Sequence, residues 1–256
     1  MGLIERNKNV GKWPRIVPVG DQAVAIEFGD QIEITVNRCV YTCAELLETA
    51  EIRGVLELIP SYRSLLVQYD SSVVSYADLL KTLKPLLPVD GNSARDQNPS
   101  KARLLTIPVL YGGDDAMDLD DVAERVGMST TEVIEIHSAG TYTVYMLGFA
   151  PGFPYLGGMD PRIACPRLPT PRVRIPAGSV GIAESQTGVY PLAGPAGWRI
   201  IGRTPARLFE PSANPPVAIM PGSFVRFKPI DADEAIRIES QATEGMYRLP
   251  ESVYEP

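Results

Sequence analysis

Arginine is concentrated in one segment of an otherwise acidic chain. The formal net charge is −7, yet residues 161–210 contain seven arginines, no lysine and only Glu184 and Glu210 as acids. Arginine binds carboxylate and phosphate through paired hydrogen bonds, so the segment predicts an anion-binding surface. Ion pairing with the acid-rich segment 114–136 is an equally good explanation, and we expect the arginines to divide between the two roles. The seven are Arg162, Arg167, Arg172, Arg174, Arg199, Arg203 and Arg207.

Neutral polar side chains lie inside the same segment. Gln186 and Thr187 precede a glycine, and Tyr190 follows it. Donors and acceptors of this kind orient small polar ligands in apolar pockets. A β-hairpin turn over residues 185–188 is the alternative explanation.

His137 is the single histidine of the chain. It ends a predicted helix, where an imidazole can either interact with the last carbonyl groups or contact a ligand. With this residue the predicted substrate- or anion-binding set is His137, Arg174, Gln186, Thr187, Tyr190 and Arg203.

The loop LGFAPGFPYLGG, residues 147–158, alternates glycine and proline with aromatic rings. A phosphate-binding loop normally leads into a helix N-terminus, but here a strand-like TYTVYM precedes the loop and no helical pattern follows. Prolines fix φ and glycines allow tight reversals, which predicts a rigid loop that shapes a pocket or a partner interface. The predicted wall residues are Phe149, Phe153, Tyr155 and Trp198, although core packing is the usual role of such rings.

Several common catalytic sites are excluded. One histidine rules out HExxH and multi-histidine zinc sites, and neither GxxxxGK[ST] nor GxSxG occurs. The three cysteines, Cys39, Cys43 and Cys165, have no metal-ligand spacing, so we expect free thiols and no metal cluster. No residue can be assigned as a catalytic acid, base or nucleophile.

The first ninety residues alternate between strand and helix patterns. This order predicts a small α+β domain with helices on one face of an antiparallel sheet. The expected strands are 23–28, 55–59 and 64–69, and the expected helices are 34–52 and 76–87, the second opened by a capping box of Ser75 with Asp78.

A polar stretch rich in proline and glycine then separates two parts of the chain. We expect an N-terminal domain over 1–88, a linker over 89–101 and a second domain over 102–256. After residue 138, short β-like runs alternate with Pro/Gly turns, a pattern typical of a barrel or sandwich.

Two short helices are expected within residues 114–136. Asp118 and Ser129 are the predicted N-caps, Ser129 in a capping box with Glu132, and Gly127 is predicted to end the first helix. A helix-turn-helix for DNA is disfavoured because this segment is acidic.

Overall charge and hydropathy restrict the partners further. An acidic chain disfavours binding to nucleic acid and to anionic membranes. No run of eighteen apolar residues and no secretory signal is evident, so we expect a cytoplasmic protein.

Three stretches resemble the carboxyltransferase-domain subunit 1 family: LGFAPGFPYLGGMDPR, TPRVRIPAGSVGIAESQTGVYPL and GWRIIGRTP. GDQAVAIEFG, IPSYRSLLVQYD and HSAGTYTVYMLGF also look like the family's pattern, so the resemblance covers nearly the whole chain. It implies an α+β fold class: a small N-terminal α/β sandwich domain followed by a C-terminal cyclophilin-like β-barrel. One local departure is GPAGW at 194–198, where a serine-proline-glycine-glycine-tryptophan turn is expected.

The resemblance implies three alternative functions. The first is the B component of an ATP-dependent 5-oxoprolinase, in which ATP is a co-substrate of the complex. In that enzyme the chain works with a paralogous carboxyltransferase subunit 2, the C-like component, and with an A-like protein. The second is an inhibitor of sensor histidine kinase autophosphorylation. The third is one half of a biotin-dependent carboxyltransferase, such as that of urea carboxylase. The retained arginine and Gln-Thr-Gly features favour the first.

Overall fold

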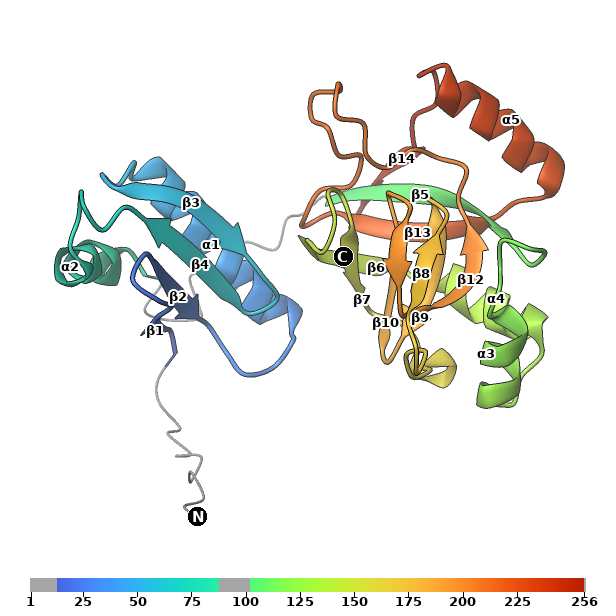
Figure 1. Cartoon of the computed structure of the whole chain (residues 1–256), viewed down its shortest axis with the longest axis horizontal. Coiled ribbons are helices and arrows are strands. Elements are labelled where there is room, and N and C mark those ends of the chain that lie inside the picture. Colours follow the sequence, from blue (N-terminus) through green and yellow to red (C-terminus); the bar gives the residue numbers. More distant parts are fainter. Residues whose placement is uncertain (1–12, 88–101, 256) are drawn as a thin grey trace, which may run out of the picture. The chain divides into compact units, whose positions relative to one another are not determined.

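The computed structural model describes residues 13–87 and 102–255 (Figure 1). The chain divides into two compact units, Met1–Asn98 and Pro99–Pro256, and each is described by itself below. The segment expected to be a linker, 89–101, lies outside the described residues.

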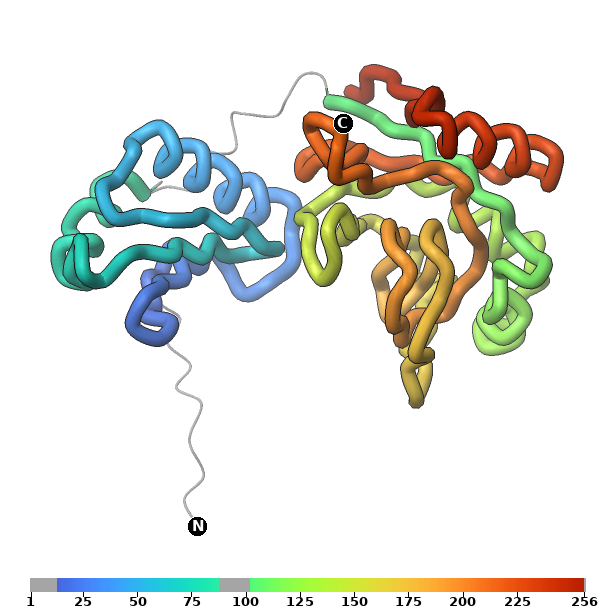
Figure 2. The backbone as a smooth tube through the Cα atoms, turned by 45° about the horizontal axis from the view of Figure 1, so that its top comes forward, coloured from blue at the N-terminus to red at the C-terminus, as the bar shows by residue number. Residues whose placement is uncertain are grey.

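The first unit is a four-stranded antiparallel sheet with two helices on one face (Figures 1 and 2). Alternation along the strands explains this arrangement: Val24 and Ile26, and likewise Leu65 and Val67, are fully buried under the helices. The sheet order is β1 (Arg15–Pro18), β2 (Ala23–Glu27), β4 (Ser64–Tyr69), β3 (Val55–Pro60), and the helices are α1 (Ile34–Thr49) and α2 (Tyr76–Leu86).

The helices of this unit begin where the sequence pattern places them, although α1 ends at Thr49, before the predicted end at Ile52. In α1, Val40, Cys43 and Leu47 make the buried stripe. Burial raises the pKa of the Cys43 thiol to about 12, so this cysteine packs as a small apolar side chain. At the start of α2, the Ser75 hydroxyl accepts a hydrogen bond from the Asp78 backbone N–H at 3.2 Å, which is one half of the predicted capping box. The Asp78 carboxylate accepts from the Ser75 hydroxyl at 2.8 Å.

The second unit is a closed β-barrel. Its strands follow the order β12-β9-β10-β7-β6-β13-β5, and the barrel closes where Gly202 and Arg203 pair with Tyr111 and Leu110. β13 runs parallel to β5, and β14 extends the other edge of β5. The bounds are β5 Ala102–Tyr111, β6 Tyr142–Leu147, β7 Pro154–Gly157, β9 Ser179–Ala183, β10 Gln186–Val189, β12 Arg199–Arg203, β13 Phe224–Pro229 and β14 Glu251–Tyr254.

Smaller elements lie around the barrel. They are α3 (Leu119–Val126), α4 (Thr130–Ala139), the 3-10 helix η1 (Pro161–Ile163), the antiparallel pair β8 (Arg172–Ile175) and β11 (Gly194–Ala196), and α5 (Ala232–Thr243). Figure 2 shows α5 and β14, in red, beside the green β5. The predicted fold class, α+β with a barrel in the second part, is therefore confirmed.

The caps of α3 and α4 differ from one another. Ser129 forms the predicted capping box with Glu132, and Gly127 ends α3 with φ of 69°. Asp118 occupies the N-cap position of α3, but its side chain makes no capping hydrogen bond, so that prediction was wrong. The carboxylate instead accepts hydrogen bonds from Arg172 and from the Ile200 backbone N–H. The paired hydrogen bonds from a guanidinium stabilise a buried carboxylate more than a single bond from a helix N–H would.

Gly178 provides a test of how tightly the barrel is closed. Its φ is +83°, and a Cβ there would collide with the Thr204 carbonyl oxygen. Gly112 has the same φ with open space around it. We expect Gly112→Ala to destabilise by about 1–2 kcal/mol from the left-handed backbone alone. Gly178→Ala should cost about 1–3 kcal/mol more, because the backbone must move. Equal changes in the free energy of unfolding, measured with denaturant, would contradict this.

Candidate functional site

An aromatic cluster gathers the rings that the sequence marked as wall residues. Phe149 and Phe153 come from the loop between β6 and β7, Tyr190 follows β10, and Trp198 precedes β12. The rings meet edge to face, with centroids 5.0 Å apart for Phe153–Tyr190, 5.6 Å for Phe153–Trp198 and 5.1 Å for Phe153–Tyr155. Such geometry stabilises aromatic pairs beyond the area they bury.

Glycine allows these rings to lie directly on the barrel wall. A Cβ at Gly188 in β10 would come within 3.0 Å of the Trp198 ring and 3.1 Å of the Phe153 ring. Thr187, the preceding residue, points the opposite way, into the barrel, where it is fully buried. The cluster is therefore packed against the outer surface of β10 and not in the barrel's central core.

Phe149 stands at the exposed edge of this cluster. Its side chain is 66% exposed, and its backbone φ is +62°, a conformation that costs energy for a residue with a Cβ. Its ring contacts Phe153 at 5.6 Å and Tyr190 at 6.1 Å between centroids. A large apolar ring held at the surface by a strained backbone is typical of a ligand or partner contact.

Tyr190 links the cluster to a cation. Burial raises the pKa of Tyr190 to about 12, while the Trp198 backbone N–H and the charge of Arg167 act in the opposite direction. The hydroxyl is therefore protonated at neutral pH and can donate a hydrogen bond. Arg167 itself is exposed.

Five of the seven arginines form ion pairs in the described residues. Arg172, Arg199 and Arg203 pair with Asp118, Asp121 and Asp115 of the acid-rich segment, as the ion-pairing explanation predicts. Arg162 and Arg207 pair with Asp160 and Glu210 close by in sequence.

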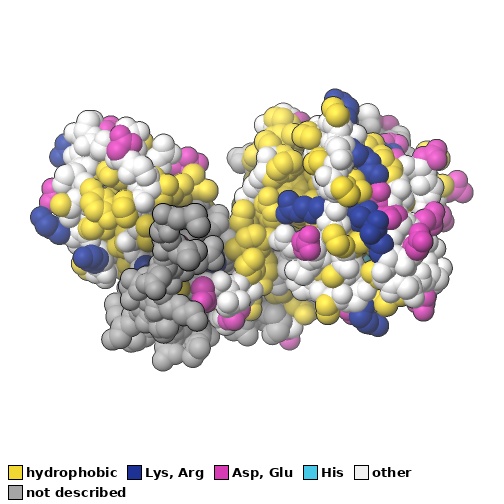
Figure 3. Space-filling model, turned by 60° about the horizontal axis from the view of Figure 1, so that its bottom comes forward, with side chains coloured by type: hydrophobic (Ala, Val, Ile, Leu, Met, Phe, Trp, Pro, Cys, Tyr) yellow, Lys and Arg dark blue, Asp and Glu magenta, His cyan; other side chains and the backbone are white. Residues whose placement is uncertain are grey.

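Arg167 and Arg174 remain. Within the described residues they make no ion pair, and both are exposed. On the face shown in Figure 3, basic side chains lie among hydrophobic ones on the barrel unit, a mixture suited to an anion carried on an apolar partner.

His137 lies inside the barrel and not on this surface. Its ring is fully buried and stacks on Phe227 with centroids 4.5 Å apart. Nδ1 lies 2.6 Å from the Tyr111 hydroxyl, and Nε2 lies 2.8 Å from Thr187 Oγ1. Thr187 donates its own proton to the Gly181 carbonyl, so Nε2 carries the imidazole proton and Tyr111 donates to Nδ1.

This network keeps the imidazole neutral. Burial lowers the pKa of His137 to about 3. In the described residues, both ring nitrogens bond to side chains, so the expected interaction with the last carbonyl groups of the helix is not the one that His137 makes. Tyr111 was not among the predicted residues; its place at the end of a buried strand gave no signal of a polar partner.

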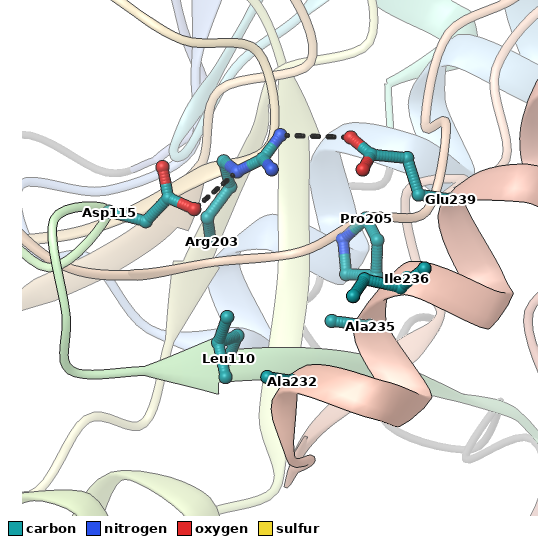
Figure 4. Close-up of a pocket in the computed structure, with 8 residues that line it drawn as sticks. All are labelled: Leu110, Asp115, Arg203, Pro205, Ala232, Ala235, Ile236 and Glu239. Atoms are coloured by element: carbon teal, nitrogen blue, oxygen red, sulfur yellow. Dashed lines mark hydrogen bonds and ion pairs between the residues drawn. The ribbon is translucent and has the colours of Figure 1, made fainter.

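The remaining predicted residues are not brought together. Gln186 is half-buried on β10, and Arg174 is exposed on β8. Arg203 lies in a separate pocket with a cavity volume of about 120 Å³, between β5, β12 and α5 (Figure 4). There its guanidinium bridges Asp115 at 2.9 Å and Glu239 at 3.3 Å. Glu239 was also missed, because its helix lies far along the chain from the arginine segment.

The grouping of side chains and the lengths of the helices bear on metal binding and membrane insertion. Among residues 13–87 and 102–255, no group of three or more His, Cys, Asp or Glu side chains could hold a metal ion. In the same residues, every helix is too short or too polar to cross a bilayer.

Comparison with known proteins gives the family. The chain is 46% identical over 221 residues to the B component of 5-oxoprolinase from Bacillus subtilis (strain 168), a match that covers 83% of this chain and 91% of that protein. The solved structure of TTHA0988 is 36% identical with a TM-score of 0.71, covering 82% of this chain and 40% of that one. The Kluyveromyces lactis urea carboxylase shares the fold over 97% of this chain at 19% identity, with a TM-score of 0.76, and this chain covers 25% of its length. Residues 14–219 match the carboxyltransferase domain, subdomain C and D, and the chain belongs to that family.

Proposed function

We propose that this chain is the B component of an ATP-dependent 5-oxoprolinase, which opens 5-oxo-L-proline to L-glutamate. The observation that carries the proposal is the 46% identity to a protein of that name over 91% of its length. The aromatic cluster, with the charge of Arg167 acting on its Tyr190, is the part of the described chain that best fits the chemistry such a component needs.

The reaction explains why cations and an apolar wall belong together. A lactam is unreactive toward water until phosphate transfer to its oxygen activates the ring carbon. The substrate carboxylate and the developing phosphate charge both need fixed donors. Arg167 and Arg174 have no ion-pair partner in the described residues and are free for this role, whereas Arg172 and Arg199 are occupied by carboxylates.

The exposure of the aromatic cluster supports the proposal that this chain acts as part of a complex. In the described part of the chain, the aromatic cluster presents a surface and not an enclosed pocket, since Phe149 is 66% exposed. We infer that the paralogous C-like component covers this surface and that an A-like protein completes the enzyme. ATP then binds on one of these partners or between two of them, consistent with the lack of a Walker loop here.

The direct test is reconstitution. The chain is co-expressed with its two partners, and ATP-dependent glutamate release from 5-oxoproline is measured. We expect activity only when all three proteins are present. Full activity without this chain would overturn the proposal. A complex that assembles but releases no glutamate would also overturn it, if the isolated chain blocks autophosphorylation of a sensor kinase. The same holds if the chain instead supports a biotin-dependent carboxylation.

Phe149→Ala should separate function from stability. Because the ring is 66% exposed in this chain, its removal is expected to leave the melting temperature nearly unchanged. Glutamate release should fall about tenfold or more, because an aromatic side chain that becomes buried at a partner interface contributes about 2 kcal/mol to binding. Met246→Ala is the control, since Met246 is equally exposed and lies after α5. Equal activities of the two variants would show that the aromatic edge has no functional contact.

A further inference from the structure

The pocket around Arg203 is built partly by residues outside the family match. That match ends at residue 219, whereas α5 spans Ala232–Thr243. Helix α5 supplies one wall of the pocket, and the ends of β5 and β12 supply the other. The pocket shares no residue with the aromatic cluster, so the inference below does not rest on the proposed 5-oxoprolinase activity.

The small side chains on one face of α5 create the cavity of this pocket. Ala232, Ala235, Ile236 and Glu239 follow the spacing of a single helical face, and all four line the pocket (Figure 4). The two alanines are too short to fill the gap to Leu110 on β5. Pro205 completes the apolar lining, and the 67% exposed Ile236 also borders the pocket.

The polar end of the pocket offers both donors and acceptors. Arg203 donates from Nε to Asp115 Oδ2 at 2.9 Å and from Nη1 to Glu239 Oε1 at 3.3 Å. In the described residues, Arg203 Nη2 and the second oxygen of each carboxylate have no protein partner. The trio has a net charge of −1, with one cation set between two anions.

We propose that this pocket binds a small aliphatic α-amino acid as its zwitterion. The ligand carboxylate binds Arg203 Nη2, and its ammonium group binds the free oxygens of Asp115 and Glu239. Its side chain fills the apolar end, against Leu110, Pro205 and Ala235. A simple carboxylate would meet the two acids, and a simple amine would meet the arginine. Only a ligand that carries both charged groups on one carbon, as an α-amino acid does, matches this arrangement.

Calorimetric titration of the full chain tests the ligand class. L-leucine is the first probe, with isocaproate, which lacks the ammonium group, and isoamylamine, which lacks the carboxylate. We expect saturable binding of L-leucine and affinities about tenfold or more weaker for the other two, since each loses a charge-assisted hydrogen bond. Absence of leucine binding at millimolar concentration, or equal binding of either single-charged analogue, overturns the proposal.

Variants locate the site. Ala235→Leu should abolish leucine binding by filling the cavity, and Glu239→Gln should weaken it about tenfold by removing one charge. Asp233→Asn removes the same charge from the same helix outside the pocket and should bind leucine as the unchanged chain does. Because Glu239 is half exposed, its substitution leaves the fold intact even if Ala235→Leu does not. Unchanged binding by Glu239→Gln places the ligand elsewhere and overturns the assignment.

Discussion

Lowering the pH from 7.5 to 5.0 is expected to reduce the free energy of unfolding of the barrel unit by about 2 kcal/mol, through His137 alone. The imidazole has a pKa of about 3 when folded, against an ordinary value of 6.5. Below pH 6.5, His137 therefore binds a proton in the unfolded chain but stays neutral in the folded chain until the pH approaches 3. Stability rises with pH across this window and is lost as the pH falls toward 3.

The chain offers an unusually clean background for this measurement, because it contains one histidine. Denaturant unfolding at several pH values, followed by Trp198 fluorescence in a Trp13→Phe background, reports the barrel unit. His137→Gln should be less stable at pH 7.5, yet its stability should change much less between pH 7.5 and 5.0. The same pH slope in both proteins would show that His137 is not the group responsible.

Asp118→Ala is expected to destabilise the barrel unit by about 3–5 kcal/mol. The Asp118 side chain is only 7% exposed and accepts hydrogen bonds from both terminal nitrogens of Arg172, at 2.8 and 2.6 Å. It also accepts from the Ile200 backbone N–H at 2.7 Å. Removing the carboxylate leaves an arginine without its partner and a buried N–H unsatisfied.

Asp160→Ala is the matched control for this prediction. Asp160 also pairs with an arginine through several hydrogen bonds, but Arg162 is 63% exposed and water can replace the lost partner. Its substitution should change the free energy of unfolding far less than Asp118→Ala does. Similar losses for the two variants in denaturant titrations would contradict the importance of burial here.

Local sequence patterns were sufficient for most elements. The alternating residues of β2 and β4 and the helical stripe of α1 are determined by which neighbours must share a buried face. Caps such as Ser75 and Ser129 are equally local, since donor and acceptor lie three residues apart. The Asp118 prediction failed because Arg172, 54 residues away, competes for the same carboxylate.

The candidate sites were predicted less completely. The sequence identified the aromatic wall residues as a group, and the structure shows that their rings meet. The sequence alone does not distinguish Arg174, which is exposed, from Arg203, which forms ion pairs with two acidic side chains. Which arginine is neutralised depends on a partner that folding brings from another element.

The sequence by itself determined the fold class, the family resemblance and the kinds of residue available for binding an anion. These follow from short-range periodicity, turn chemistry and long matching motifs. Tertiary structure alone decided that His137 is a neutral core residue bound to Tyr111 and Thr187, that Phe149 is displayed at the surface, and that α5 closes a pocket over Arg203. The physical reason is that burial and charge pairing depend on residues far apart in the chain. Burial and charge pairing in turn determine the pKa of a side chain and whether it is available to bind a ligand.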